Sequence, residues 1–179
     1  MENNNNNNTT NTITALVSNK PGVLNRVAGL FSKRGYNIES LSVCATEDDA
    51  LSRMTIVAQG DAYILEQITK QLDKLIDVKK VTRLVPDGAI ARELLLIKIS
   101  VKPAQRPEIE STANIYKAKI ADLSPSSVVL ELTGEPSKID AFIGVVTEYG
   151  IIELARTGLT ALQRGDVCIK DLDDYNELI

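Results

Sequence analysis

The residues best suited to bind a ligand are Asn19, Pro21 and Gly22, which join a strand-like segment to a short helical one in NKPGVLNRVAGLFSKRGYNIESL, residues 19–41. Pro21 fixes φ near the helical value and has no N–H to leave unpaired. Gly22 has no Cβ, so a ligand or a second backbone can approach it closely. The free N–H groups of a first helical turn favour an anion. The segment therefore predicts a carboxylate site, with a plain tight β-to-α turn as the alternative that spacing alone leaves open.

Asn37 is the second polar candidate. It follows Gly35, which stands where a glycine commonly ends a helix, and it begins the next predicted strand. Its carboxamide offers both a donor and an acceptor. Asn37 could contact the polar groups of an amino acid or only bond to neighbouring backbone, and without further information the structural role is favoured.

Most residue types that catalytic and metal sites need are missing or dispersed. The chain has no His, which removes the commonest general base and any Ser-His or Cys-His pair. Cys44 and Cys168 stand far apart and give neither a metal spacing nor a disulfide framework. The carboxylates Glu47, Asp48 and Asp49 crowd one turn between strands and are interpreted as solvated. The sequence therefore favours a protein that is not an enzyme and holds no metal or cofactor.

Charge and composition argue against nucleic-acid and membrane partners. The net charge of the 179 residues is −4, no basic stretch stands out, and aromatic residues make up only 4%. KRGYN is similar to the start of an RNA-recognition motif, but the following residues lack its aromatics. GVLNRVAG lacks the Gly-Lys-Ser/Thr end of a phosphate-binding loop. No apolar run is long enough to span a membrane, and the N-terminus lacks the regions of a signal or transit peptide.

Hydrophobic periodicity predicts an α+β fold of two consecutive ferredoxin-like βαββαβ modules. In the first, residues 12–19 alternate as a half-buried strand, and Val23, Val27 and Phe31 share one helical face. Asp61 is positioned to cap a second helix, in which Glu66 and Lys70 form an i, i+4 pair. The other predicted strands of this module are residues 36–45, 51–60 and 77–85.

The same order begins again after the turn at residues 86–89. The predicted elements are strands at 92–101, 117–123, 127–134 and 151–158, a weak helix at 107–116 and a helix at 136–150. We expect a disordered Asn-rich leader at 1–11, the first module at 12–86, the second at 87–165 and an acidic, solvated tail at 166–179. Modules of this size bury little core alone, so a homodimer is expected.

The segment PGVLNRVAGLFSKRGYNIESLSV, followed by LSRMTI and LEQITKQLDKLIDVKKV, closely resembles the regulatory (small) subunits of acetohydroxyacid synthase, also called acetolactate synthase. The similarity runs from about Ile13 to Gly165. It is most specific through Leu84, and ELLLIKI, KIDAFI, IIELARTG and LQRG fit afterwards. The resemblance implies that the first module is an ACT domain and that an amino acid binds where two such domains pair. Ser18 departs from the acidic residue that many relatives carry there, which puts the affinity in doubt but not the anion site.

The resemblance also implies a function. The chain would be a non-catalytic subunit that activates a thiamine-diphosphate-dependent catalytic subunit and confers feedback inhibition by valine or a related branched-chain amino acid. Thiamine diphosphate, FAD and Mg²⁺ would belong to that partner, and the location would be bacterial cytoplasm or plastid stroma. The alternative is a free-standing amino-acid-binding ACT regulator of another partner. The implied effector contacts are Asn19, Gly22 and Asn37, with Pro21, Val23, Leu24 and Ile38 shaping the site.

Overall fold

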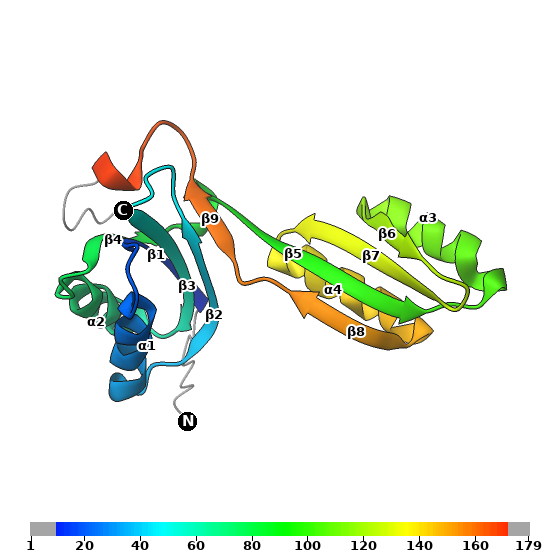
Figure 1. The fold of residues 1–179 in the computed structure, drawn as a ribbon, viewed down its shortest axis with the longest axis horizontal. Coiled ribbons are helices and arrows are strands. Elements are labelled where there is room, and N and C mark those ends of the chain that lie inside the picture. The colour runs from blue at the N-terminus through cyan, green and yellow to red at the C-terminus, as the bar shows by residue number, and fades with distance from the viewer. Residues whose placement is uncertain (1–9, 172–179) are drawn as a thin grey trace, which may run out of the picture. The chain divides into compact units, whose positions relative to one another are not determined.

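The computed structural model describes residues 10–171, so residues 1–9 of the predicted leader and residues 172–179 of the predicted tail lie outside the described residues. Residues 10 and 11, expected in the leader, belong to the first strand. Contacts divide the chain into two compact units (Figure 1). One unit contains the described residues up to Ile90 together with those from Leu159 onward. The other is Ala91–Gly158. Each unit has its own sheet and its own apolar core.

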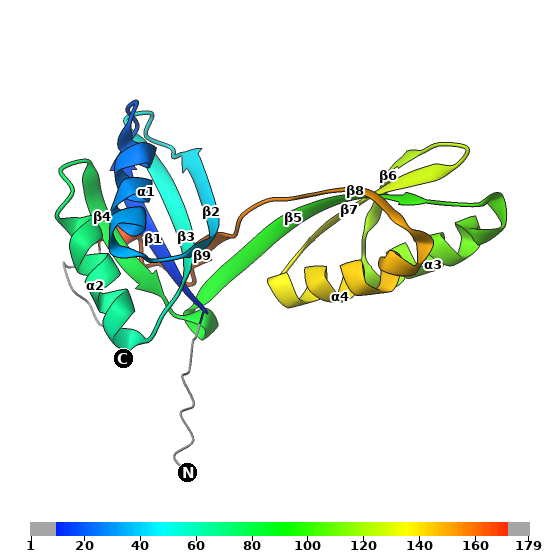
Figure 2. The ribbon, with the colours of Figure 1, turned by 90° about the horizontal axis from the view of Figure 1, so that it is seen from below.

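The first unit is a four-stranded antiparallel sheet with two helices on one face (Figure 2). Its order along the sheet is β2-β3-β1-β4, so β1 is paired on both sides. The predicted βαββαβ order is confirmed. Its elements are β1 (Thr10–Ser18), α1 (Val23–Arg34), β2 (Ile38–Ala45), β3 (Leu51–Gln59), α2 (Ala62–Asp73) and β4 (Val78–Leu84).

The sequence predicts the end of α1 and the beginning of α2 correctly. The Asp61 side chain caps α2 by accepting a hydrogen bond from the N–H of Ile64 at 2.8 Å. Gly35 ends α1 in the left-handed conformation, with φ 70°. The predicted Glu66–Lys70 ion pair forms on α2. Alternate residues of β1 pack under the helices, as the predicted pattern requires, and the fully buried members of this core include Ile13, Val27, Phe31, Ile56, Leu65, Ile68 and Leu72.

The second unit repeats the arrangement. Its four-strand order is β6-β7-β5-β8, with two helices packed on the apolar face of the sheet. Its weaker helix buries only Ile109 and Ala113, as predicted, and Pro136 stands at the first position of the other helix. The predicted fold class is therefore confirmed for both modules. The elements are β5 (Ala89–Ser100), α3 (Arg106–Tyr116), β6 (Lys119–Leu123), β7 (Ser127–Gly134), α4 (Pro136–Val146) and β8 (Ile151–Arg156).

The residues after β8 differ from the expected division of the chain. Residues 159–165 were expected in the second module and 166–179 in a solvated tail, whereas residues 159–171 group with the first unit. A short strand, β9 (Thr160–Gln163), pairs with β5, and the N–H of Arg164 donates to the carbonyl of Gly88 at 2.8 Å. Ile169, in the 3₁₀ turn Ile169–Asp171, is only 6% exposed and packs on Leu16. The acidic composition of this segment led to the prediction of a solvated tail, so the burial of Ile169 was not expected.

Replacement of Phe142 by alanine should lower the free energy of unfolding by about 3–5 kcal/mol, because the ring is fully buried in the core of the second unit and its removal leaves a cavity. The ring lies 5.1 Å from that of Tyr116, centroid to centroid. Urea unfolding measures the loss. Val145→Ala, an exposed position on the same helix, is the control and should change the free energy by less than about 0.5 kcal/mol. Equal losses in the two variants would contradict this packing.

Candidate functional site

The turn between β1 and α1 depends on the backbone conformation of Gly22. This residue has φ 86° and ψ −11°, in the left-handed region, directly before the first residue of α1. A Cβ built on Gly22 would meet no atom within 4 Å, so the requirement for glycine is conformational and the space above the residue is open. The predicted accessibility of this position to a ligand agrees with that geometry.

The first turn of α1 has no side-chain cap. The N–H of Arg26 donates to the carbonyl of Gly22 at 3.1 Å, and that of Val23 makes a long bond of 3.4 Å to Lys20. The backbone N–H groups of Leu24 and Asn25 donate to no acceptor within residues 10–171. The first turn also contains no acidic residue, in contrast to the capped N-terminus of α2. Unpaired N–H groups at the positive end of a helix dipole can bind a carboxylate.

Two contacts hold this turn against the start of β4. The N–H of Ser18 donates to the carbonyl of Asp77 at 2.7 Å. The Asp77 carboxylate forms an ion pair with Arg26 on the first turns of α1. The end of β1 and the beginning of α1 are thus attached to the same residue, which fixes the direction of the unpaired N–H groups.

Asn19 attaches the turn to the loop between β2 and β3 on the other side. Its backbone N–H donates to the carbonyl of Ala50 at 2.8 Å, and its Nδ2 donates to that of Asp49 at 2.9 Å. The Oδ1 atom accepts no hydrogen bond from the described part of the chain and remains available as an acceptor. Asn19 therefore has a structural role in the free chain, and its contact with an effector stays a prediction.

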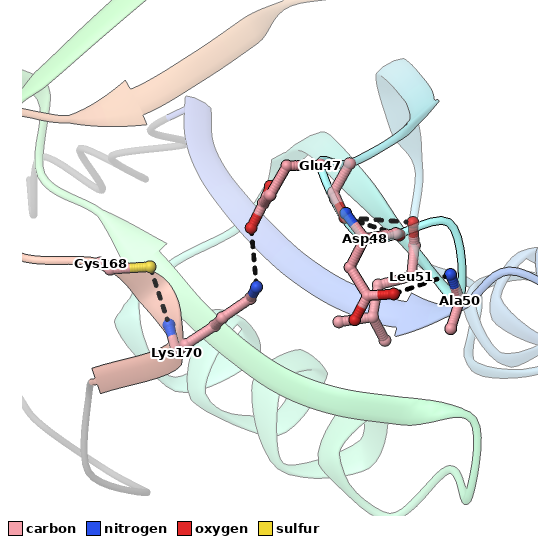
Figure 3. A network of polar contacts seen from close by, with 7 residues as sticks. Glu47, Asp48, Ala50, Leu51, Cys168 and Lys170 are labelled. Carbon is pink, nitrogen blue, oxygen red and sulfur yellow. Dashed lines mark hydrogen bonds and ion pairs between the residues drawn. The ribbon is translucent and has the colours of Figure 1, made fainter.

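The β2–β3 loop is closed by its own hydrogen bonds (Figure 3). The N–H of Ala50 donates to Asp48 Oδ1 at 3.0 Å, and the N–H of Leu51 donates to the carbonyl of Asp48 at 2.9 Å. Lys170 Nζ donates to Glu47 Oε1 at 2.7 Å, and this bond lowers the pKa of Glu47 and raises that of Lys170. This pair could not be predicted from the sequence, because its members are 123 positions apart.

The predicted site residues fall into two groups in one chain. Pro21, Gly22 and Leu24 lie with Asn19 at the N-terminal end of α1, where Leu24 is 44% exposed and Val23 is buried in the core. Asn37 and Ile38 follow the C-terminal end of α1, and Ile38 packs at the edge of the core. A twelve-residue helix is about 18 Å long. A single chain therefore does not bring the two groups together.

Between residues 10 and 171, no three or more His, Cys, Asp and Glu side chains gather in a way that could hold a metal ion. No helix in the described part of the chain is long and apolar enough to cross a membrane.

Comparison with protein families gives matches over both units. Residues 13–80 match the model described as the AHAS small subunit-like ACT domain, and residues 92–165 match the model described as the small subunit of acetolactate synthase. Among known sequences, the chain is 52% identical over 156 residues to a probable acetolactate synthase small subunit of Archaeoglobus fulgidus, covering 87% of this chain and 98% of that protein. It is 44% identical to the acetolactate synthase isozyme 3 small subunit of Escherichia coli, covering 86% and 95%.

A solved structure supports the same family assignment. The crystal structure of the acetolactate synthase small subunit from Thermotoga maritima matches with a TM-score of 0.83 and 40% sequence identity, over 89% of this chain and 99% of that one. The resemblance seen in the sequence is therefore confirmed over nearly the whole length of these relatives.

Proposed function

The chain belongs to the family of acetolactate synthase small subunits, and from this premise we propose that it activates the catalytic subunit of that enzyme and makes it sensitive to valine or a related branched-chain amino acid. The condensation of pyruvate with pyruvate or 2-oxobutanoate would take place on the partner, which would also hold thiamine diphosphate, FAD and Mg²⁺. The observation that carries the regulatory part of the proposal is the uncapped N-terminus of α1.

The turn offers the complementary group for each end of an amino acid. The carboxylate would accept hydrogen bonds from the N–H groups of Leu24 and Asn25, where the helix dipole favours a negative charge. The Oδ1 atom of Asn19 could accept a hydrogen bond from the ammonium group. The exposed side chain of Leu24 supplies apolar surface for a branched side chain.

A second copy of the chain would complete the site. Because Asn37 and Ile38 lie a helix length from Asn19 and Gly22, they can contact the same small ligand only from a neighbouring protomer. Two ACT domains placed side by side in opposite directions would set the N-terminal end of one α1 near the C-terminal end of the other. A symmetric homodimer would then carry two equivalent sites.

Regulation would follow from differential affinity. An effector shared by two protomers binds the paired arrangement that closes around it better than any other arrangement. It can shift the equilibrium of the catalytic partner only by that difference in binding free energy.

Acetolactate formation by a cognate catalytic subunit should rise when this chain is added and fall again as valine is titrated in. The catalytic subunit alone, given the same valine series, is the control. Stimulation without valine sensitivity would contradict the effector assignment. No stimulation, with no complex in size-exclusion chromatography, would contradict the partner and favour an ACT regulator of another protein.

Replacement of Gly22 by aspartate should raise the valine concentration for half-inhibition at least about tenfold relative to Gly22→Asn. Both residues tolerate the left-handed conformation better than other side chains do, so backbone strain is matched and the carboxylate charge is the difference. Inhibition curves of the two complexes measure the effect, and thermal unfolding checks that both variants fold. Identical curves would place the effector carboxylate elsewhere.

A further inference from the structure

Residues 159–171, here called the C-terminal clasp, form a cover on the first unit. Along β1, Ile13, Ala15 and Val17 face the helices, so Leu16 faces the opposite side of the sheet. Ile169 of the clasp packs on Leu16 at that side. Leu159 and Ala161 of the clasp are also buried. The sheet therefore has helices on one face and the clasp on the other.

The clasp is attached to three different elements of the same unit. At its start, the N–H of Leu159 donates to Ser40 Oγ on β2 at 3.0 Å. In its middle, the N–H of Arg164 donates to the carbonyl of Gly88 at 2.8 Å. At its end, Lys170 forms the ion pair with Glu47 in the β2–β3 loop. Ile169, which is buried, is adjacent to Lys170 and holds the backbone of that residue close to the sheet.

The β2–β3 loop thus has two attachments. Lys170 holds it through Glu47, and Asn19 holds it through the carbonyls of Asp49 and Ala50. Between these points the hydrogen bonds of Asp48 close the loop and restrict its conformations (Figure 3). Loss of the Lys170–Glu47 pair would remove one of the two attachments of the loop. The carbonyls that accept hydrogen bonds from Asn19 would then be less constrained.

We propose that the C-terminal clasp is a positioning element of the effector site: through Ile169 and Lys170 it holds the β2–β3 loop, and through that loop it holds Asn19 in the geometry that binds the amino acid. This inference rests on the proposed function for its ligand. It assigns a regulatory role to residues distant in sequence from the effector turn, and any event that loosens the clasp would weaken effector binding.

The exposed ion pair and the buried anchor make separable contributions. The side chains of Lys170 and Glu47 are 43% and 76% exposed, so their pair supplies orientation more than stability. Ile169 supplies the burial that keeps the clasp in place. Lys170→Gln should therefore weaken valine binding about threefold, and Ile169→Ala about tenfold.

The chain contains a closely matched control pair. Lys98 and Glu153, in the other unit, also form an exposed ion pair, with side chains 40% and 74% exposed. Lys98→Gln removes the same charge from a similarly exposed pair, although this pair is longer, at 3.7 Å against 2.7 Å, and should leave valine binding unchanged. The double variant Glu47→Lys, Lys170→Glu reverses the pair and should restore most of the affinity that either single change removes.

Two measurements on the full chain test the proposal. Titration calorimetry with L-valine gives the affinity. Amide hydrogen exchange at residues 18–22 and 46–51, measured without ligand, reports how readily the turn and the loop open. We expect faster exchange in both segments for Lys170→Gln and Ile169→Ala, and not for Lys98→Gln. Unchanged exchange in the two clasp variants would overturn the proposal. Faster exchange in a chain that does not bind valine would support the clasp while rejecting the proposed effector.

Discussion

The left-handed conformation of Gly22 is the constraint on which the candidate site depends. It turns the chain from β1 into α1 without a capping side chain, and few residues other than glycine adopt it at low cost. A helix that began with Ser or Asp would satisfy its own first N–H groups, as α2 does with Asp61. At α1 those groups remain unpaired, so they are available to the anion that the proposed site would bind.

The surrounding structure fixes these donors in place. The central strand β1 pairs with both β3 and β4, and its last residues are held from two sides, by Asp77 and by the β2–β3 loop. A site whose groups are already oriented loses little conformational entropy when a ligand binds, so modest contacts suffice for useful affinity. The same fixed geometry allows a change in the clasp to reach Asn19.

Much of the fold could be predicted from the sequence because its determinants are local. Alternation in the strands, the helical spacing from Val23 to Phe31, the cap at Asp61 and the glycine at position 35 each act within a few residues. The C-terminal clasp was not predicted, since Ile169 lies in a segment with many acidic residues and its partner Leu16 lies at the other end of the chain. The site was partly predictable. Local chemistry identified the turn at Gly22 and the helix between Asn19 and Asn37. It could not indicate the hydrogen bonds that Asn19 makes to Asp49 and Ala50, which lie about thirty residues away.

The most direct test of the account is the response of individual backbone amides of the ¹⁵N-labelled chain to L-valine, followed by nuclear magnetic resonance. The account predicts saturable shifts at Gly22, Leu24 and Asn25, because a carboxylate bound at the start of α1 changes the hydrogen bonding of these N–H groups. The amide resonance of Ile64, whose N–H already donates to Asp61, should not shift. Saturable shifts confined to residues away from the β1–α1 turn would contradict the account.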